Sequence, residues 1–140
     1  MNNPMALLEQ GFQNHQAGDL KKAEDFYRQA LAMDPGNSDG LNLLSIIVNE
    51  SGNTTEAIEL LEKAVRVNPG NADFFNNLGQ LYKNAGRFPD ALKAYGLALK
   101  ARPDYANAHS NLGNALSVTG DTEGAITHYC EELRIDPNNV

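Results

Sequence analysis

The chain has 140 residues, a hydrophobic fraction of 41% and a net charge of −7, with an isoelectric point near 4.8. This length fits one ordinary domain or a short array of repeats. The hydrophobic fraction excludes a disordered chain, the excess of acidic residues argues against a nucleic-acid ligand, and no apolar run approaches the roughly 18 residues of a membrane span.

The start of the chain, residues 1–10, has neither the basic region nor the apolar stretch of a secretory signal. A single cysteine, Cys130, cannot form a disulfide within the chain. We therefore expect a cytoplasmic protein that neither enters a membrane nor binds nucleic acid.

A period of 34 residues runs through the chain. Three residue types keep it, each in its own register: Pro35, Pro69, Pro103 and Pro137; Gly18, Gly52, Gly86 and Gly120; Ala23, Ala57, Ala91 and Ala125. Such a period indicates a repeat architecture, in which each repeat buries its apolar face against its neighbours. The sequence therefore predicts a single array over 1–140, with repeats at 4–37, 38–71, 72–105 and 106–139.

Each repeat is predicted to form two amphipathic helices joined by a tight turn. In chain order, the expected helices are 4–17, 20–33, 38–51, 54–67, 72–85, 88–101, 106–119 and 122–135. In the third repeat, apolar residues from Phe74 to Tyr82 keep the 3.6-residue helical spacing until Gly86 interrupts it. The second helix of that repeat ends before Pro103, which cannot continue it.

Glycines inside the first helices predict close contacts between helices. Gly11, Gly79 and Gly113 occupy equivalent places, where glycine costs about 1 kcal/mol relative to alanine. This cost is tolerable where another helix approaches closely, and the periodic alanines of the second helices are the expected partners. Tyrosines are expected to fill the wider space one turn further on: Tyr27, Tyr95 and Tyr129.

The residues that follow the periodic glycines predict helix N-caps. Asp19, Asn53 and Asp121 can each accept a hydrogen bond from the first turn of a second helix. Arg87 stands at this place in the third repeat, so no side-chain cap is expected there.

These features make the chain resemble tetratricopeptide repeat (TPR) proteins. The family's signature is most complete in the third repeat, where it comprises Leu78, Gly79, Tyr82, Ala91, Tyr95, Ala98 and Pro103. With four repeats in register, the resemblance covers nearly the whole chain. It implies an all-α fold, a right-handed α-solenoid of eight helices in four helix-turn-helix repeats, whose first helices line a concave groove.

The resemblance also implies which side chains face this groove. The apolar ones are Leu8, Phe12 and Ile46, and the carboxamides are Asn42, Asn76, Asn77, Gln80, Asn107, Asn111 and Asn114. A carboxamide offers an acceptor and donors that match the C=O and N–H groups of an extended peptide. We interpret these residues as a peptide-binding surface, with an apolar anchor at one end and Lys83 available to an acidic side chain. The alternative is that asparagine is merely tolerated on an exposed polar face, although it is a mediocre helix former.

No other chemistry is predicted. A clamp for the terminal carboxylate of a chaperone tail needs converging lysines and arginines, and its places hold none here. His15, His109 and His128 share no metal-ligand spacing with cysteine or acidic residues. We therefore expect no metal, no cofactor and no enzymatic activity in the chain itself, and a protein or peptide as its partner.

Two other functions stay open. Segments such as 76–79 and 111–116 are similar to the N-terminal repeat arm of bacterial O-GlcNAc transferases and of sulfotransferase-linked proteins. That resemblance implies a substrate-recognition arm of a larger glycosyltransferase or sulfotransferase. The other function is structural, because exposed terminal helices could join copies end to end into a homo-oligomer.

Overall fold

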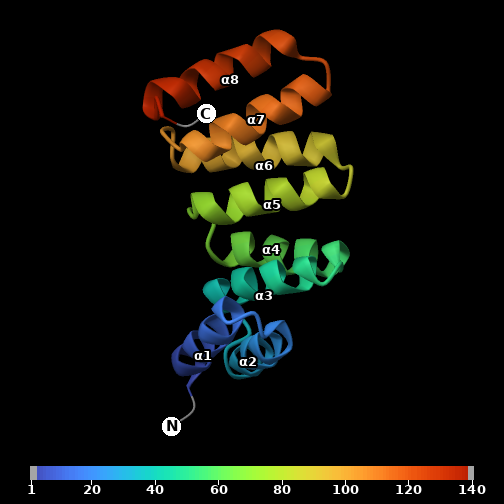
Figure 1. Ribbon diagram of the computed structural model, residues 1–140, viewed down its shortest axis with the longest axis vertical. Coiled ribbons are helices and arrows are strands. Elements are labelled where there is room, and N and C mark those ends of the chain that lie inside the picture. Colours follow the sequence, from blue (N-terminus) through green and yellow to red (C-terminus); the bar gives the residue numbers. More distant parts are fainter. Residues whose placement is uncertain (1–2, 139–140) are drawn as a thin grey trace. The chain divides into compact units, whose positions relative to one another are not determined.

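The computed structural model describes residues 3–138, which form eight α-helices (Figure 1). The helices are α1 (Pro4–Gln16), α2 (Leu20–Met33), α3 (Ser38–Glu50), α4 (Thr54–Val67), α5 (Ala72–Asn84), α6 (Phe88–Ala101), α7 (Ala106–Val118) and α8 (Thr122–Ile135). Every helix begins and ends within one residue of its predicted bounds. The predicted all-α fold of helix-turn-helix repeats is therefore confirmed.

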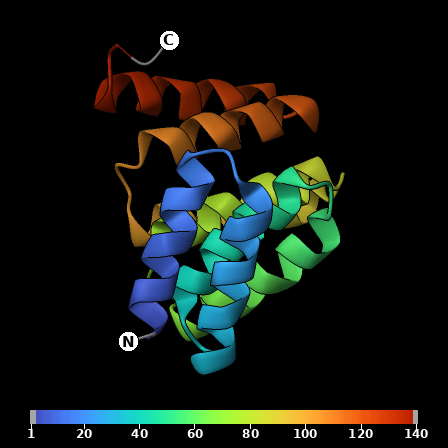
Figure 2. The same ribbon diagram turned by 60° about the horizontal axis from the view of Figure 1, so that its bottom comes forward.

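The chain divides into two compact units, Met1–Pro69 and Gly70–Val140, which hold α1–α4 and α5–α8 respectively. Within each repeat the two helices pack together, and Figure 2 shows the antiparallel course of α1 and α2. The second helix of one repeat also packs on the first helix of the next, α2 on α3 and α6 on α7. Each unit therefore consists of two repeats around a core of its own.

The turn between the helices of a repeat depends on its glycine. Gly86 has a φ of +75°, in the left-handed region that side chains rarely adopt. This conformation turns the backbone so that the Gly86 N–H donates to the Lys83 carbonyl at 3.0 Å and the Arg87 N–H donates to the Tyr82 carbonyl at 2.8 Å. Two carbonyls at the end of α5 are thereby satisfied, and the chain enters α6 after only three residues.

The predicted caps are confirmed. The side chains of Asp19, Asn53 and Asp121 accept hydrogen bonds from backbone N–H groups in the first turns of α2, α4 and α8. Arg87 makes no such bond at the start of α6. Its guanidinium instead pairs with Asp90, at 2.9 Å from Nε to Oδ2.

Gly11, Gly79 and Gly113 pack against tyrosine rings, although alanines were predicted as their close partners; only at Gly113 is an alanine, Ala125, also among the nearest neighbours, through its backbone carbonyl. A Cβ on Gly79 would lie 2.5 Å from Cε1 of Tyr95, and a Cβ on Gly11 would lie equally close to Tyr27. A flat ring can rest on a helix backbone only where no side chain intervenes. In the second repeat Ser45 takes the place of the glycine and Leu61 takes the place of the tyrosine, and each is only 1% exposed. Serine is larger than glycine, and the smaller leucine side chain leaves room for it.

Candidate peptide-binding surface

The carboxamides predicted to bind peptide in the second unit lie on α5 and α7, two helices in contact with each other. Their exposure differs. Asn107 and Asn114 are exposed, Asn77, Gln80, Lys83 and Asn111 are half-buried, and Asn76 is only 7% exposed. The exposed carboxamides are therefore open to a ligand, whereas the side chain of Asn76 is almost completely enclosed.

Asn76 and Asn111 join the two helices directly. Nδ2 of Asn111 donates to Oδ1 of Asn76 at 2.9 Å. Because Asn76 is buried, this bond supplies its carboxamide oxygen with the partner that a buried polar atom needs. Asn76 therefore orients Asn111, whose own oxygen accepts no hydrogen bond among the described residues.

A polar cluster continues from Asn76 toward the start of α5. The Tyr105 hydroxyl donates to Oδ1 of Asp73 at 2.6 Å, and a guanidinium nitrogen of Arg102 lies 3.2 Å from the same oxygen. The Arg102 guanidinium also stacks over the Tyr105 ring, 3.7 Å from its centroid. Burial raises the pKa of the Tyr105 hydroxyl to about 12, and its hydrogen bond to Asp73 acts in the same direction. Tyr105 therefore stays protonated and remains a donor at neutral pH.

Two further carboxamides are held by tyrosines of the second helices. The hydroxyl of Tyr95 donates to Oε1 of Gln80 at 2.6 Å, and that of Tyr129 donates to Oδ1 of Asn114 at 2.5 Å. Gln80 and Asn114 stand 34 residues apart, at equivalent places of consecutive repeats. The same interaction therefore fixes one carboxamide in each repeat of the second unit.

In the first unit the corresponding face is mostly apolar. Phe12 is 45% exposed and Leu8 8% exposed, while Asn42 and Ile46 are half-buried. Phe12 occupies the place that Gln80 takes two repeats later. As a consequence the buried hydroxyl of Tyr27 has no hydrogen-bond partner among the described residues.

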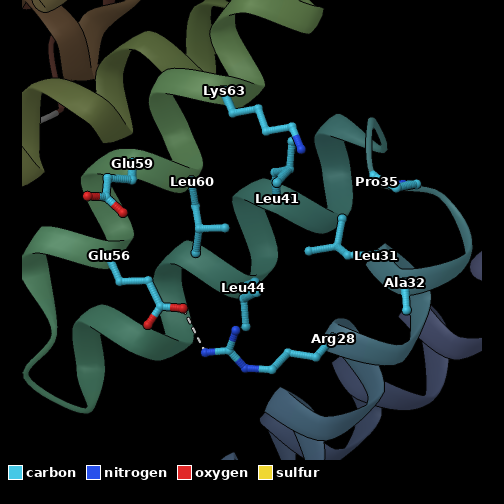
Figure 3. Close-up of a pocket in the computed structure, with 10 residues that line it drawn as sticks. All are labelled: Arg28, Leu31, Ala32, Pro35, Leu41, Leu44, Glu56, Glu59, Leu60 and Lys63. Atoms are coloured by element: carbon cyan, nitrogen blue, oxygen red, sulfur yellow. Dashed lines mark hydrogen bonds and ion pairs between the residues drawn. The ribbon is translucent and has the colours of Figure 1, made fainter.

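A pocket of about 490 Å³ lies elsewhere in the first unit, between α2 and α4 and above α3 (Figure 3). Its apolar part comprises Leu31, Ala32, Pro35, Leu41, Leu44 and Leu60. At its edge Arg28 and Glu56 point toward each other and form an ion pair at 2.8 Å, with Glu59 and Lys63 on the same helix as Glu56. The hydrogen bond with Glu56 raises the pKa of the Arg28 guanidinium. Sequence reasoning missed this pocket because its leucines belong to ordinary apolar stripes.

Sequence reasoning also missed a histidine pair in the second unit. Nδ1 of His109 on α7 lies 3.0 Å from Nδ1 of His128 on α8. The sequence could have suggested this contact, because both histidines belong to the last repeat, whose two helices are expected to pack together. Among the described residues, 3–138, no group of three histidine, cysteine or acidic side chains is arranged to hold a metal ion. No helix in that range is long and apolar enough to cross a membrane.

Comparisons with known sequences identify one family. Two family profiles, both described as tetratricopeptide repeat, match residues 48–110 and 14–37, which together make up more than half of the chain. A comparison with curated protein sequences gives no match.

Solved structures share the fold. A crystal structure of MamA superposes with a TM-score of 0.91 at 22% identity, covering 97% of this chain and 80% of that one. The Cut9–Hcn1 hetero-tetramer of the APC/C gives 0.89 at 23% identity, covering all of this chain and 28% of that one. A mutant of the Thermobaculum terrenum O-GlcNAc transferase gives 0.86 at 32% identity, covering 94% of this chain but only 26% of the transferase.

Proposed function

The chain belongs to the tetratricopeptide repeat family, and we propose that it is a non-catalytic interaction scaffold that binds an extended peptide segment on the first helices of its repeats. The observation that carries this proposal is the fixed orientation of the carboxamides on α5 and α7. An oriented carboxamide can meet a peptide backbone without first losing rotational freedom.

The hydrogen bonds within the second unit leave defined groups for a ligand. The carboxamide oxygens of Gln80 and Asn114 accept from tyrosines, while their NH₂ groups donate to no other described residue. Asn111 has the opposite arrangement, because one N–H is used and its oxygen is available. Donors and an acceptor on neighbouring helices match the alternating C=O and N–H groups of an extended peptide. Asn107 extends this set, Asn77 is a further proposed contact on α5, and Asn76 supports Asn111 from beneath.

In the first unit, Phe12, Leu8 and Ile46 are proposed to hold an apolar side chain of a ligand, next to the carboxamide of Asn42. Phe12 supports this role best, because an aromatic ring that is 45% exposed offers apolar area at small entropic cost. Lys83, half-buried near the end of α5, is proposed to contact an acidic ligand side chain.

The test is binding to a library of unstructured peptides. We expect Asn77→Ala with Asn111→Ala to weaken binding at least tenfold, because two hydrogen-bonding sites are lost at about 1 kcal/mol each. The control is Gln29→Ala, which removes an exposed carboxamide from α2. Circular dichroism checks that every variant is folded.

If the carboxamides bind the peptide backbone, changing the backbone N–H groups of the ligand must also weaken binding. For the tightest peptide found, the same sequence with methylated backbone nitrogens at alternate residues should bind much more weakly. Equal binding of the methylated peptide, or of the double variant, would contradict the proposal.

A second candidate function is a substrate-recognition arm. The 32% identity to the O-GlcNAc transferase, over 94% of this chain and 26% of that one, supports it. On this proposal the carboxamides guide a protein substrate toward a catalytic domain elsewhere in a larger polypeptide. Immunoblotting of source cells with an antibody against this chain gives a band well above 15.2 kDa if it is correct.

The third candidate, pairing of copies through terminal helices, is supported by the exposure of Ile126 (55%) and Leu133 (47%) on α8. Analytical ultracentrifugation over a concentration series tests it. A monomer at all concentrations would rule this function out.

A further inference from the structure

The two histidines of the last repeat meet almost head-on. Their Nδ1 atoms are 3.0 Å apart, whereas the ring centroids are 5.2 Å apart and the rings are inclined by only 27°. The nitrogens therefore face each other across a gap of hydrogen-bond length, and the rings do not overlap. Such a contact is favourable only if one nitrogen donates and the other accepts.

A second hydrogen bond determines which of the two Nδ1 atoms donates and which accepts. Nε2 of His109 lies 2.9 Å from the carbonyl oxygen of Pro103, in the loop between α6 and α7. A carbonyl oxygen only accepts, so Nε2 carries a proton and Nδ1 of neutral His109 is the acceptor. His128 must then donate from its own Nδ1. The two bonds link α8 through α7 to the loop that follows α6.

The first unit shows that packing alone does not require these histidines. Leu41 and Leu60 stand 68 residues earlier, at the equivalent places, and both line the pocket in Figure 3. An apolar pair is thus sufficient at this position of the fold. The histidine pair places a hydrogen bond that depends on protonation where the first unit has two apolar side chains, which do not titrate.

We propose that His109 and His128 form an acid-sensitive clasp that holds α8 on the rest of the second unit. The clasp is closed while at most one of the rings is charged, because a single proton then lies between the two Nδ1 atoms. When both rings are charged, both Nδ1 atoms carry protons, and two donors with like charges face each other. The contact then becomes repulsive and α8 loosens.

The groups around the histidine pair have opposite effects on the pKa of His128. Burial, and then the charge of His109, lower the pKa of His128, while Glu131 and Asp121 act in the opposite direction. Glu131 is itself paired with Arg134 at 3.0 Å. On α6, which packs on α7, the positively charged Lys100 stands at the place equivalent to Ala32, a lining residue of the pocket in the first unit.

The sign of the pH effect follows from the lowered pKa. Because the folded chain binds this proton less readily than the unfolded chain, the stabilisation is complete above about pH 6.5 and is lost as the pH falls through the pKa of folded His128. Acidification should therefore loosen α8 before it affects the first unit.

The test uses the full chain with ¹⁵N-labelled histidines. At pH 7.5 the nitrogen chemical shifts should show His109 protonated on Nε2 and His128 protonated on Nδ1. Hydrogen-exchange protection of the α8 amides, corrected for intrinsic rates, should be lost progressively as the pH is lowered from 7.5 to 5. The amides of α1–α4 should change far less.

Variants separate the clasp from a general effect of acid. His109→Leu with His128→Leu reproduces Leu41 and Leu60 and should make protection of α8 independent of pH. His128→Asn, which can donate to His109 but does not titrate, should do the same and serves if the double variant does not fold. His15→Gln in the first unit should leave the pH dependence unchanged. Persistence of that dependence in His128→Asn, or titration of His128 at its ordinary pKa, would overturn the proposal.

Discussion

Tyr27 and Tyr95 occupy equivalent places, but only the Tyr95 hydroxyl has a hydrogen-bond partner within residues 3–138. Tyr95 donates to Gln80, whereas Tyr27 lies opposite Phe12 and its buried oxygen is unsatisfied among the described residues. We expect Tyr95→Phe to lower the free energy of unfolding by about 1 kcal/mol, and Tyr27→Phe to leave it unchanged or raise it, because a buried unpaired hydroxyl is unfavourable. Urea denaturation measures both variants, and equal losses would contradict this account.

Individual site residues were only partly predictable from the sequence. Gln80 and Asn114 stand 34 residues apart, at equivalent places, but nothing in the sequence indicates that tyrosine hydroxyls hold their oxygens. The pairing of Asn76 with Asn111 was equally hidden, because residues 35 apart meet only when α5 and α7 pack with a particular offset. Side-chain partners depend on distances of a few tenths of an ångström, which residue spacing does not give.

At the scale of the element, α6 begins without a side-chain cap. Arg87→Asn would reproduce Asn53, which accepts from the Glu56 N–H at 3.1 Å at the start of α4. We expect a gain of about 0.5–1 kcal/mol, because a cap is worth about 1 kcal/mol and the exposed pair with Asp90 is worth less. Arg87→Ala removes the pair without adding a cap and should give no gain in urea denaturation.

The glycines of the helices are expected to differ in their tolerance of a methyl group. Gly79→Ala would place its Cβ against the Tyr95 ring and should cost about 1–3 kcal/mol. Gly96→Ala, in α6 with open space around it, should stabilise by up to about 1 kcal/mol through helix propensity. Thermal unfolding of the two variants compares them directly, and a stable Gly79→Ala chain would contradict the packing described.

Helix positions were predictable because each boundary has a local cause that repeats every 34 residues. A glycine follows the first helix, as at Gly86, and a proline follows the second, as at Pro103. A side-chain cap starts the second helix in every repeat except the third. The packing partners of the glycines inside the helices were not predictable, because alanines and tyrosines recur with the same period and spacing alone does not distinguish them. The division into two compact units likewise left no mark in the sequence.

At the scale of the whole molecule, the net charge of −7 contrasts with a proposed binding surface whose only formal charge is Lys83. Contacts between carboxamides and a peptide backbone involve no ions, so salt should screen little of the binding free energy. We expect the affinity for a peptide with uncharged side chains to change less than about twofold between roughly 0.05 and 0.5 M salt. A peptide carrying one glutamate should bind more tightly at low salt, and Lys83→Gln should abolish only that increment. Isothermal titration calorimetry gives both values. A steep loss of affinity for the uncharged peptide would show that charged residues outside this surface hold the ligand.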